Sequence, residues 1–204
     1  MAVMDDFNEF MQAKSVAMAL REKANSPATG LVDAERYLLY EAIFLRLYRA
    51  YENLLENVFL AYISGETTGS GVAVTTFVSP ANKEHARAII TSSQPFLDWT
   101  SPSVVMKRAE TYIDTGEPVR SAVAASQNHL LQAKKIRNHI AHNSSESEKE
   151  FMKVVQAILL TLPLSAISAG ELLANTPTAG PCARKEVLTY FLERLESTAL
   201  GLIA

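Results

Sequence analysis

Apolar residues recur at intervals of three and four along most of the chain, the spacing that places them on one face of an α-helix. The clearest case runs from about Val32 to Ile63 and contains neither glycine nor proline. Its apolar positions include Leu38, Phe44, Leu45, Tyr48, Leu55, Phe59 and Tyr62, with charged residues between them. This pattern predicts one long amphipathic helix, long enough to span a whole domain.

Shorter segments with the same spacing lie on both sides of the long helix. We expect helices from Asp6 to the turn at 25–30, and over 80–90, 102–113, 119–142, 146–162 and 183–200, with a kinked or separate segment over 163–173. Pro80 and Pro102 stand where a first helical turn tolerates proline, and a turn is expected at 92–95. Ser145 and Glu148 have the spacing of a capping box. The predicted fold class is all-α, a helical bundle with a long central helix and additional peripheral helices.

The segment 65–79 differs from the rest because it is rich in Gly, Ser, Thr and Val. A phosphate-binding loop needs a lysine after its last glycine, and Gly71 is followed by Val72 instead. The composition favours a flexible linker, with a short extended arm over 72–78 as the alternative. We therefore predict a single domain over 1–204 with a flexible or short extended insertion at about 65–79.

Composition and charge limit the kinds of function. Nearly half of the residues are hydrophobic, and the net charge of −3 argues against a broad electrostatic grip on nucleic acid. A single cysteine, Cys182, excludes an intrachain disulfide. No signal peptide or membrane span is apparent, so we expect a soluble, cytoplasmic protein with no membrane association.

The chemistry-bearing stretch is Arg137-Asn138-His139-Ile140-Ala141-His142, at the end of the helix predicted over 119–142. In one interpretation these are ordinary cations near the negative end of a helix dipole. In the other they are half of a nuclease site. On an ideal wheel Arg137 falls inside the apolar stripe, where an unpaired cation is costly, and His142 projects about 140° away from it. Asn138 shares a face with His142 and is placed to orient its imidazole.

These residues resemble the Rx4-6H motif of the HEPN superfamily. Arg137, the polar Asn138, three further residues and His142 match its Arg-polar-x3-His form at the end of a helix, and the long helix with Glu52-Asn53-Leu54-Leu55-Glu56 looks like its partner helix. The resemblance covers mainly the long helix and 119–162. It implies a HEPN-like bundle and a metal-independent endoribonuclease, without cofactor, that cleaves single-stranded RNA as a homodimer.

The resemblance also implies roles for the motif residues. Arg137 would stabilise charge on the scissile phosphate and His142 would transfer protons, with Asn138 as the polar position of the motif. It implies a toxin-antitoxin or phage-defence system, with an antitoxin or another protein as partner. HEPN toxins that are modified on a tyrosine carry it two residues after the motif histidine, and Ser144 stands there instead. Control by that modification is therefore not expected.

Other residues are assigned from position alone. Glu52 or Glu56 is a candidate to hold the Arg137 guanidinium, and His139 is interpreted as a surface cation or a secondary RNA contact. Lys134 and Lys135 are a solvated face or a guide for an RNA backbone. No third histidine, cysteine or acidic residue lies near His139 and His142 at a sequence spacing typical of metal ligands, so no metal site is predicted.

Two alternatives to catalysis stay open. In the first, the chain is a helical interaction protein in which Arg137 pairs with a carboxylate. In the second, it is a module that binds RNA or a nucleotide without cleaving it. Cys182, at a predicted helix start, is interpreted as a packed or idle thiol. The alternative is a thiol whose pKa is lowered by the helix start. The tyrosines of the long helix favour packing over base stacking.

Overall fold

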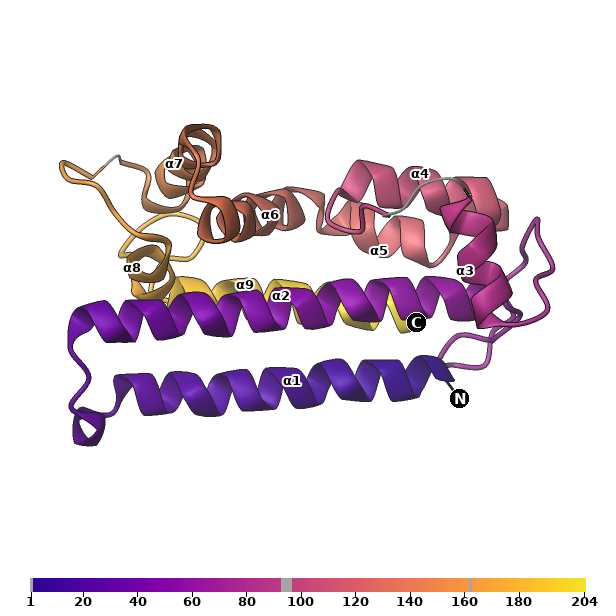
Figure 1. The fold of residues 1–204 in the computed structure, drawn as a ribbon, viewed down its shortest axis with the longest axis horizontal. Helices are drawn as coiled ribbons and strands as arrows, with labels where there is room; N and C mark the ends of the chain where they lie inside the picture. Colours follow the sequence, from indigo (N-terminus) through magenta and orange to yellow (C-terminus); the bar gives the residue numbers. More distant parts are fainter. Residues whose placement is uncertain (1, 93–96, 162) are drawn as a thin grey trace. The chain divides into compact units, whose positions relative to one another are not determined.

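The structure is a computed structural model that describes residues 2–92, 97–161 and 163–204 (Figure 1). Every regular element in these residues is a helix, and the only β-type pairings are isolated bridges. The elements are α1 (Ala2–Asn25), η1 (Pro27–Thr29), α2 (Asp33–Ile63), α3 (Lys83–Thr91), α4 (Pro102–Tyr112), η2 (Asp114–Gly116), α5 (Val119–Ala125), α6 (Gln127–His142), α7 (Ser145–Leu159), α8 (Ala169–Ala174) and α9 (Val187–Ile203). The predicted all-α class is confirmed.

The chain divides into two compact units, and α1, α2, α6 and α9 each contribute residues to both. The first unit comprises Met1–Met11, Ala50–Leu131 and Leu195–Ala204, and the second comprises Gln12–Arg49 and Gln132–Arg194. In the first unit Phe59 packs against Trp99, with ring centroids 5.4 Å apart. In the second, Phe44 and Phe191 meet edge to face at 6.1 Å. Each unit therefore has an aromatic core of its own.

The long helix is present as predicted, from Asp33 to Ile63 over 31 residues. Its fully buried side chains include Tyr40, Phe44, Tyr48, Leu55, Phe59 and Tyr62, which follow the helical spacing of the sequence. Leu38 departs from the expected apolar face, because its side chain is 65% exposed. The apolar character of this leucine therefore does not by itself indicate which side of α2 its side chain occupies.

Helix α1 buries a narrower stripe than its sequence indicated. Its most buried residues are Val3, Phe10, Ala17 and Ala24, which are spaced by seven as in a coiled-coil seam. Val16, although apolar, is 39% exposed. The side chains at 10 and 17 share one line along the helix, and position 16 lies beside it.

Two helix starts, those of α6 and α3, differ from the predictions. The helix expected over 119–142 is interrupted at Ser126, whose carbonyl accepts the N–H of Leu130 at the start of α6. Asn82 caps α3 by accepting the N–H of His85 at 2.8 Å, so Pro80 lies outside that helix. Pro102 does occupy the first turn of α4.

The capping box before α7 lies one residue earlier than predicted. Ser144 is the N-cap, and its side chain and backbone exchange hydrogen bonds with Ser147. Helix α9 begins at Val187 rather than at 183 because Arg184 has a φ of 61°, which is incompatible with a right-handed helix. The expected helix end at Leu162 and most of the turn expected at 92–95 lie outside the described residues.

The segment 65–79 is extended and hydrogen-bonded to the first unit. Gly69 donates its N–H to the carbonyl of Ile203 at 2.8 Å, and Thr75 accepts from the N–H of Asp114 at 2.9 Å. Isolated antiparallel bridges join Thr67 to Ala73 and Thr76 to Ile113. The extended alternative therefore describes this segment better than a free linker.

Within the described residues no helix has the length and apolar character needed to cross a membrane.

Candidate Arg and His site

The motif occupies the last turns of α6, in the second unit. The helix ends at His142, and Asn143 follows with a φ of 43° while donating its N–H to the carbonyl of His139 at 2.9 Å. Asparagine tolerates this left-handed conformation better than most residues, so it forms a natural helix terminus. Ser144 starts α7 at once. The turn predicted after the motif is therefore present, and it fixes where His142 ends the helix.

Arg137 is half-buried and has one polar partner within the described residues. Its Nη1 donates to Oδ1 of Asn138 at 3.1 Å. No described carboxylate of the second unit forms an ion pair with it. Because a neutral amide leaves the charge uncompensated, the guanidinium retains the capacity to bind an anion.

Asn138 has a different role from the one expected. Its amide oxygen accepts from Arg137, and no hydrogen bond joins it to His142 in the described structure. His142 is exposed in the last turn of α6, where no described residue contacts its ring through a hydrogen bond. His142 is thus accessible to a substrate.

His139 packs as an aromatic ring instead of extending as a surface cation. It stacks on Phe151 of α7, with ring centroids 4.4 Å apart and planes 7° apart. Its Nδ1 is buried without a hydrogen-bond partner. This stack fixes the end of α6 against α7, which is a positioning role that the sequence pattern did not indicate.

Lys135 belongs to a charge cluster between α6 and α7. Its Nζ lies 2.8 Å from Glu150 Oε2, and Lys153 contacts the other oxygen of the same carboxylate. The two lysines lower the pKa of Glu150 to about 2, first through the Lys135 hydrogen bond. Lys134 also has an interaction within the chain. An RNA backbone would have to compete with Glu150 for Lys135.

The two glutamates proposed to hold Arg137 lie on α2 in the first unit. Glu56 pairs with Arg87 at 2.7 Å, so it has a cation of its own. Glu52 lies beside Tyr51, whose pKa is raised by burial and secondarily by that carboxylate. A role for either glutamate at Arg137 stays a prediction.

Cysteine and metal chemistry receive no support from the geometry. The side chain of Cys182 is buried, and that burial raises the pKa of its thiol to about 11. This burial disfavours a thiolate at Cys182, which lies before the start of α9. The described residues contain no group of three or more His, Cys, Asp or Glu side chains arranged to hold a metal ion.

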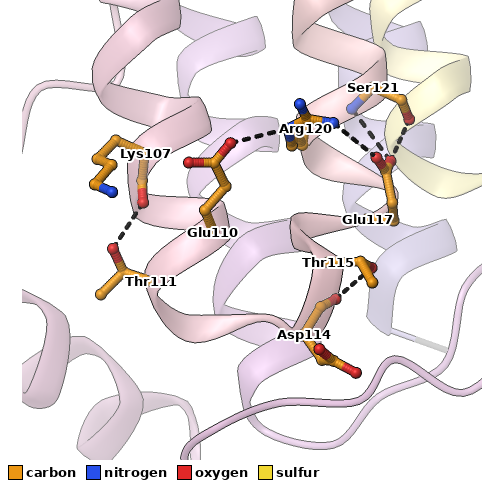
Figure 2. Close-up of polar contacts among 8 residues, drawn as sticks. All are labelled: Lys107, Glu110, Thr111, Asp114, Thr115, Glu117, Arg120 and Ser121. Carbon is orange, nitrogen blue, oxygen red and sulfur yellow. Dashed lines mark hydrogen bonds and ion pairs between the residues drawn. The ribbon is translucent and has the colours of Figure 1, made fainter.

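Two polar networks escaped the sequence analysis. In the second unit Glu186 accepts hydrogen bonds from Arg21, Tyr40 and Thr189, although its side chain is only 8% exposed. In the first unit Arg120 joins Glu110 of α4 to Glu117, which also accepts from Ser121 (Figure 2). The contacts of Glu186 with Arg21 and Tyr40, and of Arg120 with Glu110, link residues distant in sequence, so no local pattern marks them.

Comparisons with models of protein families, with curated proteins and with solved structures find no match to this chain.

Proposed function

We propose that this protein is a metal-independent endoribonuclease that cleaves single-stranded RNA at a site built from Arg137 and His142. The observation that carries the proposal is the state of Arg137, which is half-buried but has no carboxylate partner among the described residues of the second unit. An arginine held in this way by an amide binds phosphate oxygens well, because its guanidinium presents two parallel donors.

The chemistry needs only the groups that the motif supplies. RNA carries its own nucleophile in the ribose 2′-hydroxyl, so the protein must accept the proton of that hydroxyl and stabilise charge on the phosphorus oxygens. His142 is exposed, and an imidazole can accept that proton as a general base. Attack of the 2′-oxygen on the phosphorus breaks the bond to the 5′-oxygen, which takes a proton from an imidazolium of the site as it leaves. The products are a cyclic 2′,3′-phosphate and a 5′-hydroxyl.

The geometry of α6 favours a site completed by a second copy. Arg137 and His142 are five residues apart, which separates their directions by about 140° and their positions by about 7.5 Å along a straight helix. The two side chains of one helix are therefore poorly placed to meet at one phosphate. A twofold axis would bring Arg137 of one protomer to His142 of its partner, and would do so twice.

The surrounding residues fit supporting roles in this proposal. Asn138 holds Arg137 at 3.1 Å, and His139 fixes the helix end through its stack on Phe151. The resemblance of the motif helix to HEPN ribonucleases supports a role for this activity in a toxin-antitoxin or phage-defence system. An antitoxin or another protein partner would then hold the nuclease in check.

The test is incubation of the purified protein with single-stranded RNA in excess chelator. We expect wild-type cleavage with cyclic phosphate ends and a loss of at least about 100-fold in Arg137→Ala and in His142→Ala. Lys149→Ala, which removes an exposed cation from α7, is the matched control and should cleave normally. Cleavage that requires a metal, or that persists in both motif variants, contradicts the proposal. RNA binding without any cleavage would support a non-catalytic binding module.

A further inference from the structure

A groove on the second unit lies away from the motif residues. In this unit the C-terminal half of α1 and the N-terminal half of α2 run in opposite directions, connected through η1 (Figure 1). The groove has a volume of about 490 Å³. Its lining residues are Leu20 of α1 and Leu39, Ala42, Ile43, Leu45, Arg46 and Arg49 of α2. This volume is within the range of small-molecule sites, about 300–1,000 Å³.

The groove is amphiphilic along its length. On α2 its lining residues up to Leu45 are all apolar, and Arg46 and Arg49 follow at the C-terminal end of the same stripe. From Leu39 to Arg49 the helix advances about 15 Å. Val16, one turn before Leu20 on α1, is 39% exposed. The groove thus offers an apolar body and a cationic end.

The two arginines are not neutralised by the chain. Within the described residues neither Arg46 nor Arg49 forms an ion pair, and no carboxylate lines the groove. On the same helix Glu41, five residues before Arg46, accepts the N–H of Gly170 through Oε1 at 2.9 Å, and Glu52, three residues after Arg49, has an interaction of its own within the chain. Two exposed guanidinium groups three residues apart lie on one side of the helix, where both can contact a single anionic group.

We propose that this groove binds an anionic amphiphile, a carboxylate or phosphate head group on an unbranched apolar chain. The head group pairs with Arg46 and Arg49, and the chain lies along Leu39, Ile43 and Leu20. Burial of the chain supplies affinity in proportion to its apolar area, while the guanidinium pair selects the sign of the head group. The proposal is independent of the ribonuclease activity.

The experiment is a calorimetric titration of the full chain with decanoate and, in a second arm, with decyl phosphate. We expect saturable binding of one ligand per chain in at least one arm, and the stronger arm identifies the head group. Arg46→Gln with Arg49→Gln should weaken that binding at least tenfold. Lys23→Gln with Lys149→Gln, which removes two exposed cations outside the groove, should change it less than twofold.

Two further measurements make the result decisive. Ala42→Phe fills the groove from an exposed helix position, so it should abolish binding while circular dichroism and the thermal midpoint stay near wild type. Decyltrimethylammonium, with the same chain and the opposite charge, should not bind in the groove. The proposal is overturned by absence of saturable binding in both arms, by equal binding of the cationic amphiphile, or by equal losses in the two double variants.

Discussion

The imidazole of His139 lies flat against Phe151, with ring centroids 4.4 Å apart and planes 7° apart. Phe151 is fully buried, so the contact fixes the last turns of α6 on α7. His139, two residues after the motif arginine Arg137, is therefore part of the support of the site. His142, three residues later, is exposed at the helix end.

Replacement of His139 tests its packing role at the end of α6. His139→Ala should lower the free energy of unfolding by about 1–3 kcal/mol, because it removes an aromatic pair and leaves a gap beside Phe151. His139→Phe keeps the stack and removes the unpartnered Nδ1, so its stability should be within about 0.5 kcal/mol of wild type. Urea denaturation measures both values. Equal stability of the two variants would contradict the packing role.

The Glu186 network should be the most sensitive polar feature of the second unit. Its carboxylate accepts from Arg21 and Tyr40, each at 2.5 Å, and Glu186→Ala leaves these donors without their acceptor. We expect a loss of about 3–5 kcal/mol in the free energy of unfolding. Glu193→Ala is the matched control, because its pair with Lys185 is exposed and contributes less than about 1 kcal/mol. Similar losses in both variants would rule out the network as a stabilising element.

Close backbone packing at Gly170 predicts a large effect of a single methyl group. A Cβ at this position would lie 2.1 Å from the carbonyl oxygen of Tyr37, so the backbone of α8 would have to move away from α2. Gly170→Ala should cost about 3 kcal/mol or more. Gly201→Ala places its Cβ 3.0 Å from the Cβ of Ala122, and the cost there should be much smaller. Thermal unfolding of the two variants tests the difference.

The Glu150 carboxylate should titrate well below the usual range for glutamate. Lys135 and Lys153 lower its pKa to about 2, so it stays charged as the pH falls from neutrality to about 3. Because the folded-state pKa is lowered, the stabilising contribution is present above the ordinary pKa of 4.5 and is lost as the pH approaches 2. Carbon-detected NMR of the carboxyl group measures this midpoint. In Lys135→Gln with Lys153→Gln it should move back toward the ordinary value, and no movement would exclude the lysines as the cause.

The sequence predicted the features that depend on local pattern. The long helix was predicted within one residue of its observed start, because its apolar spacing is uninterrupted over 31 residues. The break at Ser126, the C-cap of α5, was missed because the apolar spacing continues through it, and periodicity alone does not detect a change of backbone conformation at one residue.

The site was predicted less completely than the fold. The position of Arg137 in a partly buried stripe follows from the wheel, and the structure agrees with it. The stack of His139 on Phe151 and the pairing of Lys135 with Glu150 depend on how α7 folds back after Asn143. Such contacts between helices are set by tertiary packing, which one-dimensional spacing does not encode.

The most direct test of the proposed site is complementation between two inactive variants. Arg137→Ala and His142→Ala are unfolded together in urea, refolded as a mixture, and assayed on single-stranded RNA in excess chelator. In a mixed dimer with shared sites, one site loses both residues and the other keeps both. Random pairing should therefore restore about a quarter of wild-type cleavage. A mixture as inactive as its parents, beside an active refolded wild type, would contradict a site shared between two copies, and an inactive wild type would contradict the ribonuclease itself.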